Sequence, residues 1–182
     1  LGNTDKAASA REKAGDIQGA AQLYLKEGNY RKALAVYLRN GHLDAAKSVY
    51  GQAVAHYSKG KEYSSLVGIH IDMGEHEKAA GVEKDAGLYE AAEIYGDLLR
   101  SEQSSPEGEK ARFCKQKLRS CAELLMKEGG KSCEYAARFF RHLGEFGREG
   151  DAYFQAGNYK KAEIIFRGLR MKERAAECNI LL

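Results

Sequence analysis

One short string of the sequence has residue types found in phosphate-binding loops. Gly129, Gly130, Lys131 and Ser132 match the end of such a loop, in which glycines let backbone amides approach a phosphate and a lysine neutralises its charge. The full pattern also needs a glycine at the place of Leu125, a strand before the loop and a helix after it. Leu125 lies in an apolar helical stretch with no strand signal before it. We therefore predict a turn between two helices here.

A second group contains side chains that bind metal ions: His70, Asp72, Glu75 and His76. Three or four ligands must converge on a zinc ion, and His70 and His76 are not spaced as i,i+4 partners on one helix face. We interpret the group as polar residues around the turn at Gly74. Separated members of a catalytic triad leave no local pattern here. We therefore expect no enzyme, no metal ion and no cofactor.

The four cysteines are Cys114, Cys121, Cys133 and Cys178. None forms a Cys-x-x-Cys pair, and Cys114 and Cys121 would lie about 10.5 Å apart along a helix, too far to bridge. We interpret them as small buried side chains of a protein in a reducing, cytoplasmic compartment.

Positive charge gathers towards the C-terminus. Residues 1–106 hold 13 Lys and Arg against 15 Asp and Glu, whereas residues 107–182 hold 16 against 11. If the last helices bind a ligand, we expect an anionic one. The candidate binding residues are Lys160, Lys161, Arg167, Arg170 and Lys172. They fall on two helical turns and need not form one patch, and acidic neighbours allow the alternative that they only solvate a helix face.

A thirteen-residue rhythm sets out the elements that carry these residues. A glycine opens each step, an alanine follows five residues later and an aromatic ring nine residues later. Clear steps are Gly15-Ala20-Tyr24, Gly28-Ala33-Tyr37, Gly41-Ala46-Tyr50 and Gly157-Ala162-Phe166. Glycine allows the left-handed backbone that ends a helix, and an Asn or Asp after it caps the next helix. The alanine and the ring then share one face, where a neighbouring helix packs closely.

This rhythm predicts an all-α fold: an α-solenoid of about twelve short antiparallel helices in about six hairpins. No alternation typical of a strand persists anywhere in the chain. We expect the rings Tyr24, Tyr37, Tyr50, Tyr153 and Phe166 to be largely buried. The expected helices are 4–13, 17–27, 30–40, 43–58, 62–73, 76–86, 89–103, 107–128, 132–143, 146–156, 159–168 and 171–181.

The rhythm is interrupted at residues 101–106, which include Pro106, the only proline of the chain. We predict a linker or elbow here that divides one continuous solenoid into residues 1–103 and residues 104–182. The register already runs at Gly2, and residues 179–182 form an apolar edge. We therefore expect this chain to be a piece of a longer array, since solenoids end in polar capping repeats.

Two strings resemble the second helix of a tetratricopeptide repeat: GNYRKALAVY at residues 28–37 and GNYKKAEIIF at residues 157–166. The hairpin here is shorter than that repeat, about 26 residues against 34, and lacks its proline. The shorter step is similar to the helical tails of coatomer and intraflagellar-transport subunits. This resemblance implies a TPR-like helical scaffold of the kind used in intracellular transport, although such arrays serve unrelated processes.

Three functions remain open from the sequence. The first, which we favour, is a non-catalytic scaffold that binds protein partners as part of a larger assembly. The second is an adaptor that binds an acidic peptide, and the third is the helical arm of a nucleic-acid-linked helicase or ATPase. Nucleic acid is the least favoured partner, because the net charge of +3 is small for that role. No apolar run reaches the roughly 18 to 20 residues that span a bilayer, so no membrane insertion is expected.

Overall fold

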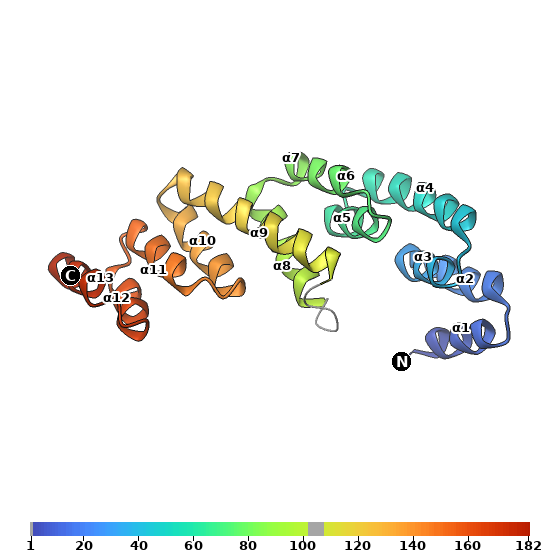
Figure 1. Ribbon diagram of the computed structural model, residues 1–182. Helices are drawn as coiled ribbons and strands as arrows, with labels where there is room; N and C mark the ends of the chain where they lie inside the picture. The colour runs from blue at the N-terminus through green and yellow to red at the C-terminus, as the bar shows by residue number, and fades with distance from the viewer. Residues whose placement is uncertain (1, 102–107) are drawn as a thin grey trace. The chain divides into compact units, whose positions relative to one another are not determined.

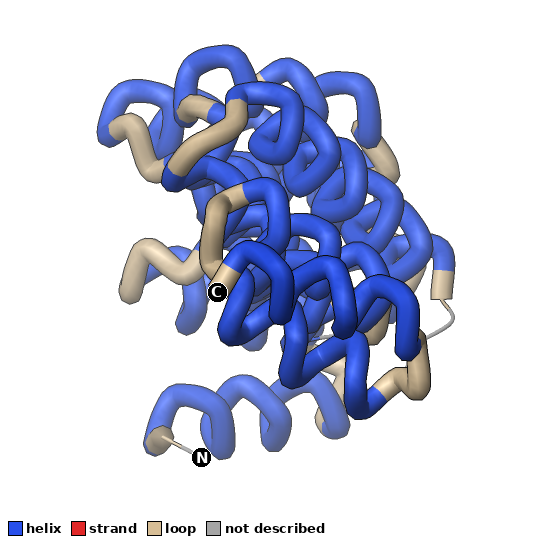
Figure 2. The backbone as a smooth tube through the Cα atoms, turned by 90° about the vertical axis from the view of Figure 1, so that its left-hand side faces the viewer, coloured by secondary structure: helices blue, strands red, loops and turns tan. Residues whose placement is uncertain are grey.

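The computed structural model describes residues 2–101 and 108–182, and all regular secondary structure in these ranges is helical (Figures 1 and 2). No strand occurs in either range. Packing divides the chain into two compact units, Leu1–Ala79 and Ala80–Leu182, which we call unit 1 and unit 2. The all-α fold predicted from the sequence is confirmed.

Unit 1 is a run of short helices that pack in chain order. Consecutive helices contact each other in the series α1, α2, α3, α4 and α5, and α3 also contacts α5. The helices of unit 1 are α1 (Asn3–Lys13), α2 (Ile17–Lys26), α3 (Tyr30–Arg39), α4 (Leu43–Gly60), α5 (Tyr63–Asp72) and the first residues of α6 (His76–Gly81).

Unit 2 follows the same scheme. Each helix from α7 to α13 contacts the next, and α8 also contacts α10. Consecutive packing of this kind defines an α-solenoid, in which a repeat contacts only its neighbours. After the end of α6, the helices of unit 2 are α7 (Glu83–Ala86), α8 (Leu88–Ser101), α9 (Glu109–Glu128), α10 (Lys131–His142), α11 (Phe146–Gln155), α12 (Tyr159–Gly168) and α13 (Lys172–Leu181).

The turns between the helices have the predicted chemistry. Gly28 and Gly157 have φ angles of +70° and +76°, the left-handed conformation that glycine adopts without steric cost. The next residues, Asn29 and Asn158, cap α3 and α12. The side chain of Asn29 accepts a hydrogen bond from the backbone N–H of Lys32, and Asn158 makes the equivalent bond.

Two turns differ from the simple rule. We expected a helix over residues 43–58, but α4 continues through Gly60, and the residue with positive φ is Lys61, at +54°. Arg170, which stands in the place of a glycine between α12 and α13, has a φ of +59°. These two turns therefore have the left-handed backbone without a glycine, and this conformation crowds the Cβ atom of each residue.

The expected division of the chain is only partly covered by the described residues. The helix expected at 76–86 is present as two shorter ones, α6 and α7, separated at Val82. Residues 102–106 of the expected linker lie outside the described residues, so the boundary between 103 and 104 stays a prediction. The helices on either side of it, α8 and α9, pack against each other, and the two packing units divide instead at Ala79 and Ala80.

The aromatic rings lie in the core with one exception. Tyr24, Tyr37 and Tyr153 are buried, and Phe166 has no exposed surface. Tyr50 is only half-buried, because α4 is longer than the other helices around it and buries Tyr57, two turns further on.

Small residues let the helices approach each other, as the rhythm predicted. Ala33 and Ala162 have no exposed surface. In α11, Gly150 lies against the ring of Phe166, and a Cβ atom added at Gly150 would stand 2.5 Å from the nearest ring carbon. A ring of one helix therefore packs directly on the backbone of the preceding helix.

Candidate binding site

The structure brings three of the five candidate basic residues together. Arg167, Arg170 and Lys172 line one pocket between α12 and α13. Lys160 lines a different pocket, which includes Asn158 and Glu134. The ammonium group of Lys161 lies 4.9 Å from the centre of the Tyr153 ring and is held there by a cation–π contact. All five side chains are exposed.

The pocket between the last two helices has a volume of about 350 Å³, and we call it the α12–α13 pocket. Glu163 and Arg167 come from α12, and Arg170 comes from the turn. Its other lining residues, all from α13, are Lys172, Ala175, Ala176 and Asn179. Most of its surface is apolar, formed by the alanines and by carbon atoms of the longer side chains. The pocket thus combines an apolar wall with a rim of three cations.

Glu163 is the unusual residue of this pocket, because only 7% of its surface is exposed. Its carboxylate pairs with the guanidinium group of Arg167, which is itself 73% exposed. The contact is made through Oε1 of Glu163, so a cation of the same helix compensates the charge of this buried carboxylate.

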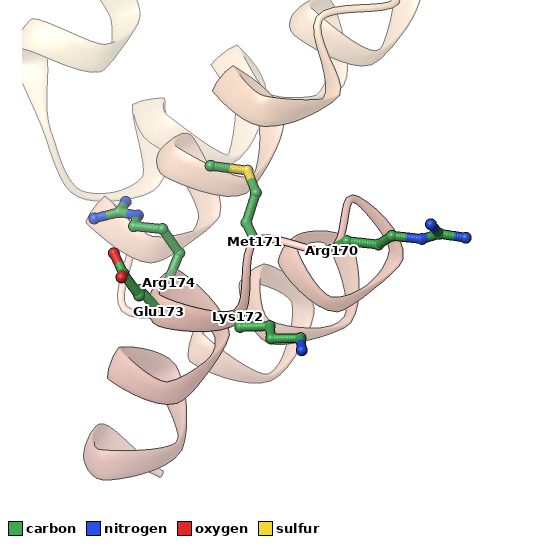
Figure 3. Close-up of a pocket in the computed structure, with 5 residues that line it drawn as sticks. All are labelled: Arg170, Met171, Lys172, Glu173 and Arg174. Carbon is green, nitrogen blue, oxygen red and sulfur yellow. The ribbon is translucent and has the colours of Figure 1, made fainter.

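A second, more open pocket of about 410 Å³ lies at the turn itself, and Figure 3 shows the five residues that line it. These residues, 170–174, are consecutive, so this pocket is the surface of one turn and not a cleft between elements. In Figure 3 the side chains of Arg170 and Arg174 extend in opposite directions. Of the two, Arg170 belongs to the rim of the α12–α13 pocket.

Arg174 has a structural role. It pairs with Asp151 of α11 and with Glu177. Its guanidinium group also lies 5.0 Å from the ring centre of Phe154 and 4.9 Å from that of Phe166. These contacts hold α13 against α11 and α12.

Large apolar side chains are exposed on both helices that line the pocket. Ile164 of α12 is 60% exposed and Ile180 of α13 is 83% exposed. The same end of unit 2 exposes four more: Leu169, Met171, Leu181 and Leu182. Exposed apolar groups beside a charged rim are typical of a surface that contacts another protein.

The structure places the other candidate residues from the sequence in a turn or in contacts between helices. Gly129 and Gly130 both have positive φ in the turn between α9 and α10, which is the predicted turn between helices. His70 is buried and shares a hydrogen bond of 2.9 Å with the hydroxyl of Tyr50, and burial lowers the pKa of His70. Asp72 pairs with Arg31 at 2.7 Å. Across the residues with described positions, no three His, Cys, Asp or Glu side chains gather as metal ligands.

The four cysteines are buried, as predicted, and no disulfide joins any of them to a described residue. Burial raises the pKa of the Cys121 thiol to about 12, with a further contribution from the nearby carboxylate of Glu83. At neutral pH this thiol is protonated and therefore a weak nucleophile.

Buried carboxylates are the feature that the sequence reasoning missed. Glu149 is 1% exposed and accepts a hydrogen bond of 2.8 Å from Nε of Arg141. It stands five residues after Gly144, where the rhythm places an alanine, and Glu163 directly follows Ala162. A glutamate in or beside the alanine position is the signal that could have pointed to both, because this face of the helix is the buried one.

No helix in the described part of the chain is both long and apolar enough to cross a bilayer. Comparisons of the chain with protein-family models, with curated proteins and with solved structures find no match.

Proposed function

We propose that this chain is a non-catalytic helical-repeat module that binds a protein partner, and that the partner docks on the hairpin of α12 and α13. One observation carries the proposal: Arg167, Arg170 and Lys172 surround one mostly apolar pocket, with Ile164 exposed on the same helix as Arg167. Interfaces combine apolar contacts with arginine in this way.

The wider role follows from the resemblance in the sequence. The thirteen-residue step and the consecutive packing of helices are those expected of a TPR-like array, similar to the tails of coatomer and intraflagellar-transport subunits. On this proposal the chain is a segment of a larger scaffold in the cytoplasm, and its four buried thiols fit a reducing compartment.

The charge of the rim favours one kind of partner. Arg167 is already paired with Glu163, so Arg170 and Lys172 are the rim cations that attract a segment with acidic side chains, and Arg170 can bind a carboxylate with two parallel hydrogen bonds. An adaptor that binds an acidic peptide is therefore the specific form of the scaffold function that we favour.

A titration with two anionic ligands tests this proposal. The ¹⁵N-labelled chain is titrated at low salt with the blocked peptide Glu-Glu-Phe-Glu-Glu and, separately, with single-stranded oligothymidylate. We expect the peptide to shift backbone amide signals of α12 and α13. The oligonucleotide should shift none of these signals more than the peptide does. Larger shifts with the oligonucleotide would indicate a nucleic-acid arm instead, and no shift with either ligand would contradict the proposed binding of acidic partners.

A further inference from the structure

We propose that α1 is a releasable strap that occupies a docking site for acidic helices on α2 and α3. A partner helix with two carboxylates seven residues apart takes the place of α1 on Lys32 and Arg39. The site lies in unit 1, so it is separate from the α12–α13 pocket and does not rest on the function proposed above.

The strap α1 has little apolar contact with the helix on which it packs. All residues of α1 are described, and Ala8 is the only buried one. By contrast, α2 and α3 each bury four of their ten residues. The backbone of α1 packs on α2, but the methyl group of Ala8 removes little apolar surface from water. Polar contacts therefore hold α1 in place.

These polar contacts include two matched ion pairs. Nζ of Lys32 lies 2.7 Å from Oδ1 of Asp5, and Nη2 of Arg39 lies 2.9 Å from Oε2 of Glu12. The two carboxylates are seven residues apart on α1, and the two cations are seven residues apart on α3. Because seven residues are about two helical turns, each set lies on one face of its helix. The spacing of the carboxylates thus fits the spacing of the cations.

Each carboxylate of α1 also accepts a second hydrogen bond. The hydroxyl of Tyr24 donates to Asp5 at 3.0 Å, and Nδ2 of Asn40 donates to Glu12 at 2.8 Å. The neighbouring lysine and Tyr24 lower the pKa of Asp5, while Asn40 and the neighbouring arginine lower the pKa of Glu12. Both carboxylates are therefore charged at neutral pH. Four donor side chains of the docking site select for two negative charges.

The same contacts allow α1 to leave while the other helices stay folded. The side chains of Lys32 and Arg39 are 49% and 63% exposed. Ion pairs with such exposure contribute little to stability, and salt screens them. A segment with few buried apolar contacts opens locally before the core unfolds. Release of α1 leaves the two cations of α3 without these acidic partners.

A partner helix can also make an apolar contact that α1 does not make. Ala35 and Val36 lie between the two cations on α3, and with these cations and Tyr24 they line a cavity of about 190 Å³. None of the residues of α1, all of which are described, lines this cavity. The residue of α1 that stands one turn from each carboxylate is Ser9, which is exposed. A helix with a larger apolar side chain at that place fits the cavity better than α1 does.

Charge reversal on α1 tests the release. In the 182-residue chain, Asp5→Lys/Glu12→Lys replaces both attractions by repulsion. We expect amide hydrogen exchange in α1 to become at least about tenfold faster, while α2 to α5 keep their protection. Adding Lys32→Glu and Arg39→Glu restores both pairs with opposite sign and should slow the exchange of α1 again. Unchanged exchange in the double variant, or no recovery in the charge-swapped variant, overturns the strap.

A peptide tests the docking site itself. The blocked peptide with the sequence of residues 2–15 is titrated into the ¹⁵N-labelled double variant and into the unaltered chain. We expect it to shift amide signals of α2 and α3 in the double variant and to bind the unaltered chain at least about tenfold more weakly, because α1 competes there. The peptide with Asp5→Asn and Glu12→Gln should bind neither protein. Absence of binding to the double variant overturns the docking site, and equal binding to both proteins overturns its occupation by α1.

Two further forms of this peptide test the cavity. With Ser9→Leu the peptide should bind the double variant about tenfold more tightly than its parent, because the leucine side chain enters the cavity. The Ser9→Ala peptide is the control, since alanine favours the helix without filling the cavity, and its gain should be smaller. Equal affinities of the leucine and alanine forms would show that the cavity takes no part in docking.

Discussion

Lys61 and Arg170 are the non-glycine residues with positive φ in the described part of the chain. Each occupies a turn position that glycine fills at most other turns of this protein. The left-handed conformation brings the Cβ atom close to the backbone, at a cost of roughly 1 kcal/mol. These two residues are therefore places where a single substitution can relieve local crowding.

We predict that Lys61→Gly raises the free energy of unfolding by about 1 kcal/mol, because glycine removes the crowded Cβ atom. The matched substitution in the opposite direction is Gly157→Ala, where φ is +76°, and it should cost about the same. Urea unfolding followed by circular dichroism measures both. A loss of stability in Lys61→Gly would contradict this account of the turn.

His70 makes the stability of unit 1 depend on pH. Burial lowers the pKa of His70 in the folded chain, with a further contribution from the charge of Lys78, whereas in the unfolded chain it titrates near the ordinary value of about 6.5. Below that pH the unfolded state binds a proton that the folded state does not. The free energy of unfolding should therefore fall as pH decreases from about 6.5 towards the pKa of His70 in the folded chain. Well above pH 6.5, about the unfolded pKa, His70 should not change the free energy of unfolding.

Urea unfolding between pH 7.5 and pH 5, a range of about 2.5 units around that pKa, checks this prediction. The comparison is His70→Gln, which cannot titrate and should show a flatter dependence in the same range. Equal slopes for the two proteins would mean that His70 is not the responsible group.

At the scale of the helices, the contact of Phe166 with Gly150 sets how closely α11 and α12 pack. Alanine at position 150 would place its Cβ atom 2.5 Å from a ring that has no exposed surface to move into. We predict that Gly150→Ala lowers the free energy of unfolding by about 1–3 kcal/mol, even though alanine favours the helix.

Gly147 of the same helix is the control, since a Cβ atom there meets no atom within 4 Å. Gly147→Ala should be neutral or stabilise the protein by at most about 1 kcal/mol. Thermal unfolding of the two variants gives the comparison, and equal effects would contradict the close packing of Phe166.

The alanines of the rhythm support a parallel prediction. Ala33 and Ala162 have no exposed surface, so Ala33→Leu and Ala162→Leu should each overpack a helix contact and cost about 1–3 kcal/mol. Ala35 lies on the exposed side of α3, and Ala35→Leu should change stability little. Chemical denaturation distinguishes the two faces, and an unchanged midpoint in Ala33→Leu would show that the helices are not in close contact there.

The helices and their ends were predictable from the sequence because their signals are local. Gly28 and Asn29 end one helix and cap the next through atoms a few residues apart, and the same holds for Gly157 and Asn158. The incomplete burial of Tyr50 was not predictable, since it depends on α4 continuing to Tyr57.

The candidate site was predictable only in part. The basic residues of the last two helices stand out in the sequence, yet which of them meet depends on the turn at Arg170, and Lys161 is held against Tyr153 instead. The burial of Glu163 depends on how α13 packs over α12, which is a tertiary contact that no local spacing encodes.

At the scale of the whole molecule, the proposed binding depends on which helices of the array carry the binding residues. The helices of unit 2 pack on their neighbours in chain order, so the α12–α13 hairpin presents its binding residues on a local surface. The central claim is that the α12–α13 hairpin, and not positive charge in general, binds an acidic partner. Two triple variants that lower the net charge equally separate these explanations.

The decisive measurement is the dissociation constant of fluorescein-labelled Glu-Glu-Phe-Glu-Glu, by fluorescence anisotropy, from low salt to about 0.15 M, where the Debye length is about 8 Å. Neutralising Arg167, Arg170 and Lys172 to glutamine should weaken binding at least about tenfold and remove most of its salt dependence. The control neutralises three exposed lysines of unit 1: Lys6, Lys26 and Lys47. It should leave the affinity within about twofold. An equal loss in both triple variants, or binding that ignores salt, would contradict the account.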